Sequence, residues 1–203
     1  MKGPNFNGNQ FAQQALDAGA AYAIIDEQAF EVAGKTILVE DVLTALQQLA
    51  NYHRRQFNIP LIAITGSNGK TTTKELIHVV LSAKYKVYTT EGNLNNHIGI
   101  PLTLLKIKRD AEIAVVEMGA NHLHEIEGYC QVAEPTHGLI TNCGKAHLEG
   151  FGSLEGVRKG KGELFDYLRT REDATAFIMQ DYDYLQEMSK GIARIVTYGT
   201  HDA

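Results

Sequence analysis

Apolar residues follow two spacings along this chain, and each spacing predicts a different element. Short apolar runs, typical of strands buried on both faces, recur from Leu61 onward. They define strands at Leu61–Ile64, Lys86–Thr90, Glu112–Glu117, His137–Thr141, Ala174–Met179 and Ala193–Tyr198. Apolar positions three and four residues apart predict helices after Lys70, at Gly99–Leu105, at Ser153–Arg169 and before the last strand. This alternation predicts an α/β fold, with a mostly parallel sheet and helices on both faces.

The residues before Leu61 carry a weaker pattern. It predicts a loop, a helix, two strands separated by a polar turn, and a second helix that Asp41 caps. The first four elements are Met1–Asn9, Gln10–Asp17, Ala21–Ile25 and Lys35–Val39. So short a segment buries too little apolar surface for a core of its own. We therefore expect residues 1–59 to be the remainder of a small α/β N-terminal domain and residues 60–203 to form a central domain.

A glycine-rich turn joins the first central strand to its helix. It reads Gly66-Ser67-Asn68-Gly69-Lys70-Thr71-Thr72. Glycines permit positive φ and close approach to a phosphate, while backbone amides and the helix dipole attract anions. In a P-loop of this kind, Lys70 reaches the β- and γ-phosphates and the Thr71 hydroxyl binds Mg²⁺. The general P-loop has Gly where this chain has Ile64, and an ordinary turn is the alternative, but the pattern favours a nucleotide site.

Five further polar residues are candidates for chemistry. Glu117 closes an apolar strand, where P-loop proteins commonly place a carboxylate on the Mg²⁺ of the nucleotide; an exposed strand end is the alternative. His147 also follows a strand, although a single loop histidine is more often polar surface. Lys161 lies in a predicted helix, and a solvated lysine is its simpler interpretation. Asn95 and Asn96 either contact a ligand or form Asx turns.

Composition narrows the possible partners. The net charge of −5 gives no electrostatic reason to expect nucleic acid as a partner. The two cysteines, Cys130 and Cys143, make no disulfide framework and are expected in the core of a protein from a reducing compartment. No apolar run approaches the roughly 20 residues that cross a bilayer, and the N-terminus lacks a signal-peptide core. We expect a monomeric, cytoplasmic protein that neither binds nucleic acid nor inserts into a membrane.

Four segments of the chain resemble the Mur ligases. They are Thr65–Thr72, Gly92–Leu105, Glu117-Met-Gly-Ala-Asn121 and Ala146-His-Leu-Glu-Gly-Phe-Gly-Ser153. The family has the same shortened Gly-x-x-Gly-Lys-Thr turn, which accounts for Ile64. Asn5-Phe6-Asn7-Gly8, with Phe11, Ala15 and Gly19-Ala20, is similar to the UDP-sugar-binding domain of the family. The Glu-Met-Gly-Ala-Asn and Asn-Leu-Asn-Asn segments favour the branch of the family that adds D-Ala-D-Ala.

This resemblance implies a role for each residue of the P-loop and for the strand-end acid. Gly66, Ser67, Asn68, Gly69, Lys70, Thr71 and Thr72 would hold the phosphates of ATP. Lys70 would be catalytic, because it acts on the β- and γ-phosphates. Thr71 and Glu117 would bind one Mg²⁺.

The remaining candidates receive their roles from the same resemblance. His147 would be catalytic through a second Mg²⁺ that it shares with the substrate carboxylate. Lys161 matches a catalytic lysine that Mur ligases can carry as a carbamate, and in that form it would bind metal. Asn95 and Asn96 would help to position the nucleotide and the peptide.

The implied activity is ATP-dependent amide formation in peptidoglycan precursor synthesis. The terminal carboxylate of UDP-N-acetylmuramoyl tripeptide attacks the γ-phosphate, giving an acyl phosphate and ADP, and the amine of D-Ala-D-Ala then expels phosphate. A sister Mur ligase, a folylpolyglutamate-synthase-like ligase and a non-catalytic nucleotide-binding module are the alternatives. Because Mur ligases have three domains, we expect the C-terminal domain to be missing and the chain to be a fragment that is inactive alone.

Overall fold

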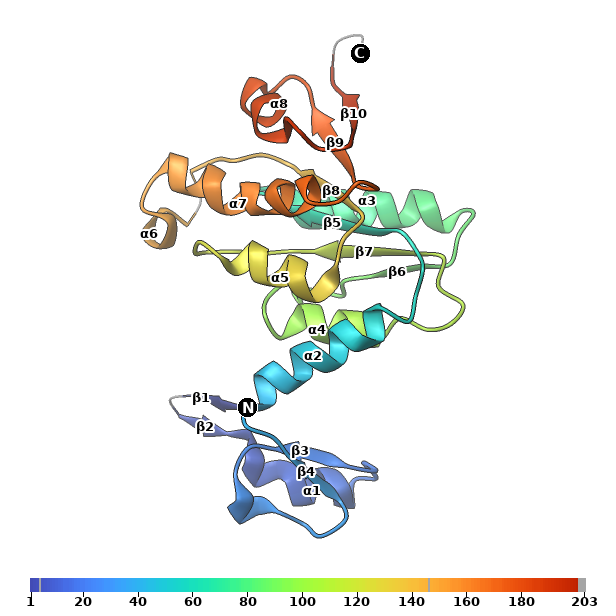
Figure 1. Ribbon diagram of the computed structural model, residues 1–203, viewed down its shortest axis with the longest axis vertical. Helices are drawn as coiled ribbons and strands as arrows, with labels where there is room; N and C mark the ends of the chain where they lie inside the picture. The colour runs from blue at the N-terminus through green and yellow to red at the C-terminus, as the bar shows by residue number, and fades with distance from the viewer. Residues whose placement is uncertain (4, 146, 201–203) are drawn as a thin grey trace. The chain divides into compact units, whose positions relative to one another are not determined.

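The computed structural model describes residues 1–3, 5–145 and 147–200. The chain forms two compact units, one over Met1–Leu49 and one that begins at Ala50. Helix α2 (Val42–Arg54) runs across this division (Figure 1).

The first unit is built from short elements. They are β1 (Lys2–Gly3), β2 (Phe6–Asn7), the 3-10 helix η1 (Gly8–Phe11), α1 (Ala12–Asp17), β3 (Ala23–Ile25), the 3-10 helix η2 (Gln28–Phe30) and β4 (Thr36–Leu38). The predicted loop at the N-terminus instead contains an antiparallel ribbon, β1 with β2. The polar turn between β3 and β4 is not a hairpin, because η2 returns the chain so that the two strands pair in parallel. Asp41 caps α2 as predicted, since its Oδ1 accepts the N–H of Thr44 at 2.7 Å.

A six-stranded sheet forms the centre of the second unit, in the order β10-β9-β8-β5-β7-β6 (Figure 1). Its strands are β5 (Leu61–Thr65), β6 (Val87–Thr89), β7 (Ile113–Glu117), β8 (His137–Ile140), β9 (Thr175–Met179) and β10 (Arg194–Tyr198). Every neighbouring pair in this sheet is parallel. The predicted α/β fold and the six predicted strands are therefore confirmed.

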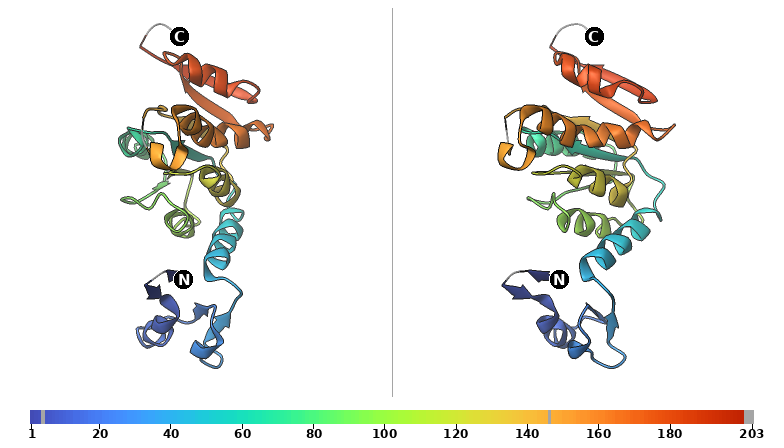
Figure 2. Two further views of the ribbon diagram at one scale, coloured as in Figure 1. Left: turned by 90° about the vertical axis from the view of Figure 1, so that its left-hand side faces the viewer. Right: turned by 60° about the vertical axis from the view of Figure 1, so that its left-hand side comes forward.

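Helices cover both faces of this sheet, as predicted (Figure 2). They are α3 (Lys70–Ser82), α4 (Gly99–Leu105), α5 (Glu125–Ala133), α6 (Leu148–Phe151), α7 (Leu154–Arg169) and α8 (Asp183–Ser189). On one face, Ile77 and Leu81 of α3 pack against Ile62 and Ile64 of β5. Side chains of α4, α5 and α7 form the larger core on the other face.

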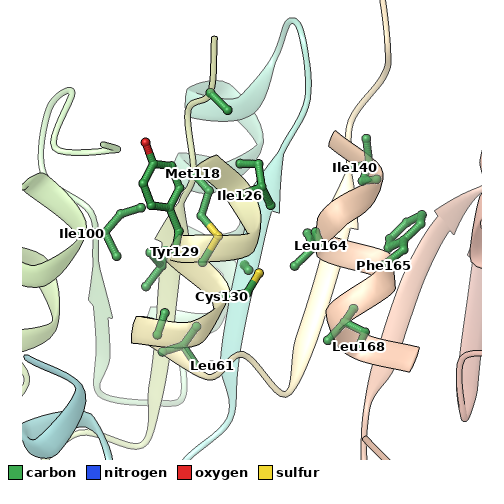
Figure 3. Packing of buried hydrophobic residues seen from close by; sticks show 14 of the residues in the cluster. Leu61, Ile100, Met118, Ile126, Tyr129, Cys130, Ile140, Leu164, Phe165 and Leu168 are labelled. Carbon is green, nitrogen blue, oxygen red and sulfur yellow. The ribbon is translucent and has the colours of Figure 1, made fainter. Parts of the chain in front are cut away.

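The larger core fixes the strands whose ends carry the candidate residues. Figure 3 shows side chains of α5 and α7, among them Cys130, Leu164 and Leu168, gathered beside the strand that carries Leu61. Cys130 and Cys143 are both buried and unpaired, which confirms them as core residues. None of the described helices combines the length and the apolarity of a membrane-crossing segment.

Candidate functional site

The glycine-rich turn lies between the end of β5 and the first residue of α3. Gly66 and Gly69 have φ of +140° and +80°, and a Cβ on Gly66 would overlap Oγ1 of Thr141. Only glycine satisfies both the backbone angle and the space at this position. The turn therefore lies at the N-terminus of a helix of 13 residues, which is an electropositive place suited to an anion.

Lys70 folds back over this turn. Its Nζ donates to the carbonyl oxygens of Gly66 at 2.8 Å and of Ser67 at 3.4 Å. Burial lowers the pKa of Lys70, and the nearby negative charge of Glu117 opposes that shift. The ammonium thus lies against the glycine-rich turn, within the electrostatic reach of Glu117.

The loop that follows β8 holds the turn from the other side. The N–H of Ser67 donates to the carbonyl of Asn142 at 2.9 Å, and the N–H of Asn68 donates to Oδ1 of Asn142 at 3.2 Å. Oγ1 of Thr141 donates to the carbonyl of Asn68 at 2.7 Å, and the N–H of Gly144 donates to Oγ of Ser67 at 3.0 Å. Thr141 and Asn142 were not among the predicted site residues. Their position directly after a parallel strand was the available signal, since such strand ends share one edge of the sheet.

Glu117, the last residue of β7, is only 1% exposed. Its Oε1 accepts a hydrogen bond from Nδ2 of Asn95 at 2.8 Å, and its backbone N–H donates to Oγ1 of Thr90 at 3.0 Å. Its Oε2 is buried without a hydrogen-bond partner in the described part of the chain. A buried carboxylate oxygen without a donor is costly, so this atom fits a cation.

The donors around Glu117 suit Mg²⁺ held jointly with a nucleotide. Mg²⁺ takes oxygen ligands and commonly combines one or two carboxylates with water and phosphate. Within residues 1–3, 5–145 and 147–200, no group of three or more His, Cys, Asp or Glu side chains could hold a metal by itself. Thr71, exposed in the first turn of α3, offers a hydroxyl beside the phosphate-binding turn. Glu117 and Thr71 therefore fit the ion only together with a phosphate ligand.

Lys161 is buried in α7 and is only 1% exposed, so its interpretation as a solvated lysine is wrong. Its Nζ donates to the carbonyl of Ala120 at 2.7 Å and lies 5.1 Å from the centroid of the Phe151 ring. Burial, together with the positive charge of Lys70, lowers the pKa of Lys161 to about 8. With this pKa roughly a tenth of the lysine is neutral at pH 7, far more than for an ordinary lysine, and the neutral amine is a nucleophile.

Two other predicted residues are placed differently. His147 is exposed, has φ of +54°, and precedes α6; its imidazole makes no hydrogen bond or ion pair with the described residues. Asn96 forms an Asx turn that leads into α4, because its Oδ1 accepts the N–H of Ile98 at 3.1 Å and of Gly99 at 2.9 Å. Lys70 lies within the electrostatic reach of both Glu117 and Lys161, and His147 lies exposed at the start of α6.

Comparison with protein families matches residues 64–203 of this chain to the Mur ligase middle domain. The chain belongs to the Mur ligase family. This Mur ligase chain is 41% identical over 204 residues to the UDP-N-acetylmuramoyl-tripeptide–D-alanyl-D-alanine ligase of Bacillus subtilis, covering 100% of the chain and 44% of that protein. It is 42% identical over 168 residues to the Escherichia coli ligase of the same name, covering 83% of the chain and 37% of that protein.

A solved structure resembles the Mur ligase chain over its whole length. The MurF ligase from Thermotoga maritima in complex with ADP has a TM-score of 0.88 and 32% sequence identity, covering 100% of this chain and 47% of that one. The Mur ligase chain thus spans less than half the length of the relatives that it matches.

Proposed function

We propose that this chain carries the ATP- and Mg²⁺-binding centre of a ligase that joins D-Ala-D-Ala to UDP-N-acetylmuramoyl tripeptide. The observation that carries the proposal is the buried Oε2 of Glu117, which has no hydrogen-bond partner among the described residues, in a side chain within the electrostatic reach of the P-loop ammonium of Lys70. The relatives named for this ligase activity support the choice of reaction and substrates.

In this proposal the P-loop holds the phosphates of ATP. Backbone amides of Gly66–Thr72 and the N-terminus of α3 bind the phosphate oxygens. Lys70 exchanges its bonds to Gly66 and Ser67 for bonds to the β- and γ-phosphates. Because Lys70 is half buried, its charge acts through a medium less polar than water and stabilises the charge that develops on the transferred phosphoryl group.

Thr71 and Glu117 would hold one Mg²⁺, and Asn95 orients the Glu117 carboxylate through its bond to Oε1. The ion supplies positive charge that lets the anionic substrate carboxylate approach the anionic triphosphate. The substrate carboxylate then attacks the γ-phosphorus and releases ADP, and the D-Ala-D-Ala amine attacks the resulting acyl phosphate, loses a proton and releases inorganic phosphate.

Lys161 is proposed as a carbamate. Its neutral amine adds to CO₂, a nitrogen–carbon bond forms and a proton is released, so a buried amine becomes an anion with two oxygen ligands. The low pKa and the burial of Lys161 support this step, because they favour the neutral amine. His147 and the carbamate would then share a second Mg²⁺ with the substrate carboxylate, and Asn95 and Asn96 would help to position nucleotide and peptide.

The first unit is proposed to bind the UDP-sugar portion of the UDP-N-acetylmuramoyl tripeptide. The same proposal divides the chain into an N-terminal domain of residues 1–59 and a central domain of residues 60–203. The rings of Phe6 and Phe11 stack with centroids 5.6 Å apart and are about half exposed. With Lys2 and Asn7 they line a pocket of about 370 Å³. Aromatic faces suit a nucleobase and a lysine suits a phosphate. A cytoplasmic location and a monomeric state are part of the same proposal.

Product analysis tests the proposed reaction. The chain, extended to the full length of its relatives, is incubated with UDP-N-acetylmuramoyl tripeptide, ATP, Mg²⁺ and D-Ala-D-Ala, and the mixture is examined by mass spectrometry. We expect the pentapeptide product together with ADP and phosphate. Preferential addition of a single amino acid would identify a sister Mur ligase. ATP binding without any ligation product would support a non-catalytic nucleotide-binding chain.

Substitution of the P-loop lysine tests the nucleotide site separately. Lys70→Ala should weaken MgATP binding, because the phosphates lose their nearest ammonium, and any ligation should fall by roughly 10²-fold or more. Isothermal titration calorimetry measures the binding. Lys84→Ala, which changes an exposed lysine beyond the same helix, is the control. Equal MgATP affinity in the Lys70→Ala variant and the parent would remove Lys70 from its proposed role.

A further inference from the structure

Lys74 is a fully buried lysine to which the proposed reaction gives no role. It lies on α3, one helical turn after Lys70. Its Nζ donates to the carbonyl oxygen of Thr90 at 2.6 Å and pairs with Oε1 of Glu75 at 2.9 Å. Burying an ammonium costs free energy, and an apolar side chain of similar length often fills such a site equally well. The presence of a lysine with these two contacts therefore requires an explanation.

Thr90 is equally buried, and each of its polar atoms has a partner from helix α3 or strand β7. Its carbonyl accepts from Lys74, and its backbone N–H donates to the carbonyl of Val115 at 3.2 Å. Its Oγ1 accepts the backbone N–H of Glu117 at 3.0 Å. A continuous hydrogen-bonded path therefore runs from α3 through Thr90 to the last residue of β7.

This path joins the two elements that carry the proposed ligands of the first Mg²⁺. Thr71 lies on α3, three residues before Lys74, and Glu117 lies at the end of β7. Thr90 also precedes the loop whose Asn95 donates to Oε1 of Glu117. Glu117 is thus held through its backbone by Thr90 and through its carboxylate by Asn95, which leaves Oε2 as the oxygen without a partner in the described part of the chain.

We propose that Lys74 and Thr90 are positioning residues that set the distance between the Thr71 hydroxyl and the Glu117 carboxylate. The inference rests on the proposed function, because it gives those two groups a shared Mg²⁺. Groups that orient metal ligands without touching the metal typically change metal affinity by 10- to 100-fold when they are removed. A purely structural role would instead lower stability and weaken all nucleotide binding alike.

The test compares nucleotide binding with and without Mg²⁺. Lys74→Met removes the ammonium while keeping the length of the side chain, and Thr90→Val removes the hydroxyl while keeping the shape. Thr90→Ser restores the hydroxyl, and Lys84→Met is the control for an exposed lysine. Each variant of the full chain is titrated with ADP by calorimetry, first in excess EDTA and then over a range of Mg²⁺ concentrations. Thermal unfolding verifies that each variant is folded.

We expect Lys74→Met and Thr90→Val to reach the ADP affinity of the parent only at Mg²⁺ concentrations about 10-fold or more higher. Residues that orient metal ligands without touching the metal have effects of this size. Their ADP affinity in EDTA should stay close to that of the parent, and Thr90→Ser and Lys84→Met should match the parent in both conditions. If Lys74→Met does not fold, the difference in Mg²⁺ requirement between Thr90→Val and Thr90→Ser tests the inference.

Two outcomes overturn the inference alone: an unchanged Mg²⁺ requirement in Thr90→Val, or equal losses with and without Mg²⁺. A parent chain whose ADP binding does not respond to Mg²⁺ overturns the proposed function, and the positioning role falls with it. The behaviour of the parent therefore separates the two failures.

Discussion

Lys161 illustrates how far a single residue could be understood from the sequence. Its helix was predicted, but its burial was not, because lysine on a helix is usually solvated. The signal was the apolar stripe of α7, in which Val157, Leu164, Phe165 and Leu168 are fully buried and position 161 falls on the same side. The partner of its Nζ, the carbonyl of Ala120, depends on tertiary packing and had no counterpart in the sequence pattern.

The low pKa of Lys161 predicts how stability depends on pH. Below pH 8 the lysine is protonated in both states, and the cost of burying its charge is fully present. Between about pH 8 and the ordinary value of 10.5, the folded chain loses the proton first, so stability rises with pH, by up to about 3 kcal/mol. Lys161→Met should lack this part of the rise and should be more stable than the parent at pH 7. Urea unfolding at pH 7 and pH 10 measures both effects, and parallel pH dependences in parent and variant would contradict them.

Substitution of Glu117 should change stability and Mg²⁺ binding in different directions. Glu117→Gln keeps an oxygen that can accept the hydrogen bond from Asn95, but it removes a buried charge whose second oxygen has no partner among the described residues. We expect an unfolding temperature equal to or above that of the parent, together with a loss of the Mg²⁺ dependence of ADP binding. Differential scanning calorimetry and titration calorimetry measure the two properties. A less stable variant that kept Mg²⁺-dependent binding would exclude the proposed role.

At the scale of elements, the strands of the sheet could be predicted because each is a short apolar run that ends near a turn. Helix α5 was not predicted, although Ile126, Tyr129, Cys130 and Ala133 follow helical spacing and are buried. Gly128 lies within this helix, outside the stripe, and weakens the local preference for helix. Packing of α5 against α4 and α7 overrides this preference.

Replacement of Gly66 and of Gly128 by alanine should have opposite effects on stability. At Gly66 the backbone angle and the contact with Thr141 are both incompatible with a Cβ, so Gly66→Ala should destabilise the chain by about 1–3 kcal/mol and weaken nucleotide binding. At Gly128 the backbone is helical and no atom of a neighbouring element lies within 4 Å of the place that an alanine methyl would take, so Gly128→Ala should stabilise by about 0.5–1 kcal/mol. Chemical unfolding measures both variants. A stabilising Gly66→Ala would contradict the description of the turn.

At the scale of the whole molecule, the two units differ in how much core they contain. Up to Leu49, the buried apolar residues of the described chain are Ala12 and Ile25, whereas the second unit has two extended clusters. The weak periodicity of the N-terminal sequence corresponds to this small core, and the parallel pairing of β3 with β4 left no pattern in the sequence. Folding free energy depends on buried apolar area, so the two units should differ in local stability.

Hydrogen exchange tests this difference. Backbone amides in residues 1–49 should exchange faster than those of β5, β7 and β8, because fewer buried contacts oppose local opening there. Exchange followed by mass spectrometry of peptides resolves the two regions. Equal protection in both would show that the first unit gains its stability from something other than its own core.

The contacts between the P-loop and the loop after β8 bear on ligand selectivity. The amides of Ser67 and Asn68 and the ammonium of Lys70 already have carbonyl or amide partners within the chain. A small inorganic anion such as sulfate must replace those internal partners in order to bind, so it gains little in the exchange. A polyphosphate spans several donors at once and adds charge that the internal oxygens lack. The P-loop should therefore bind common buffer anions weakly and bind nucleotides that carry two or three phosphates more tightly.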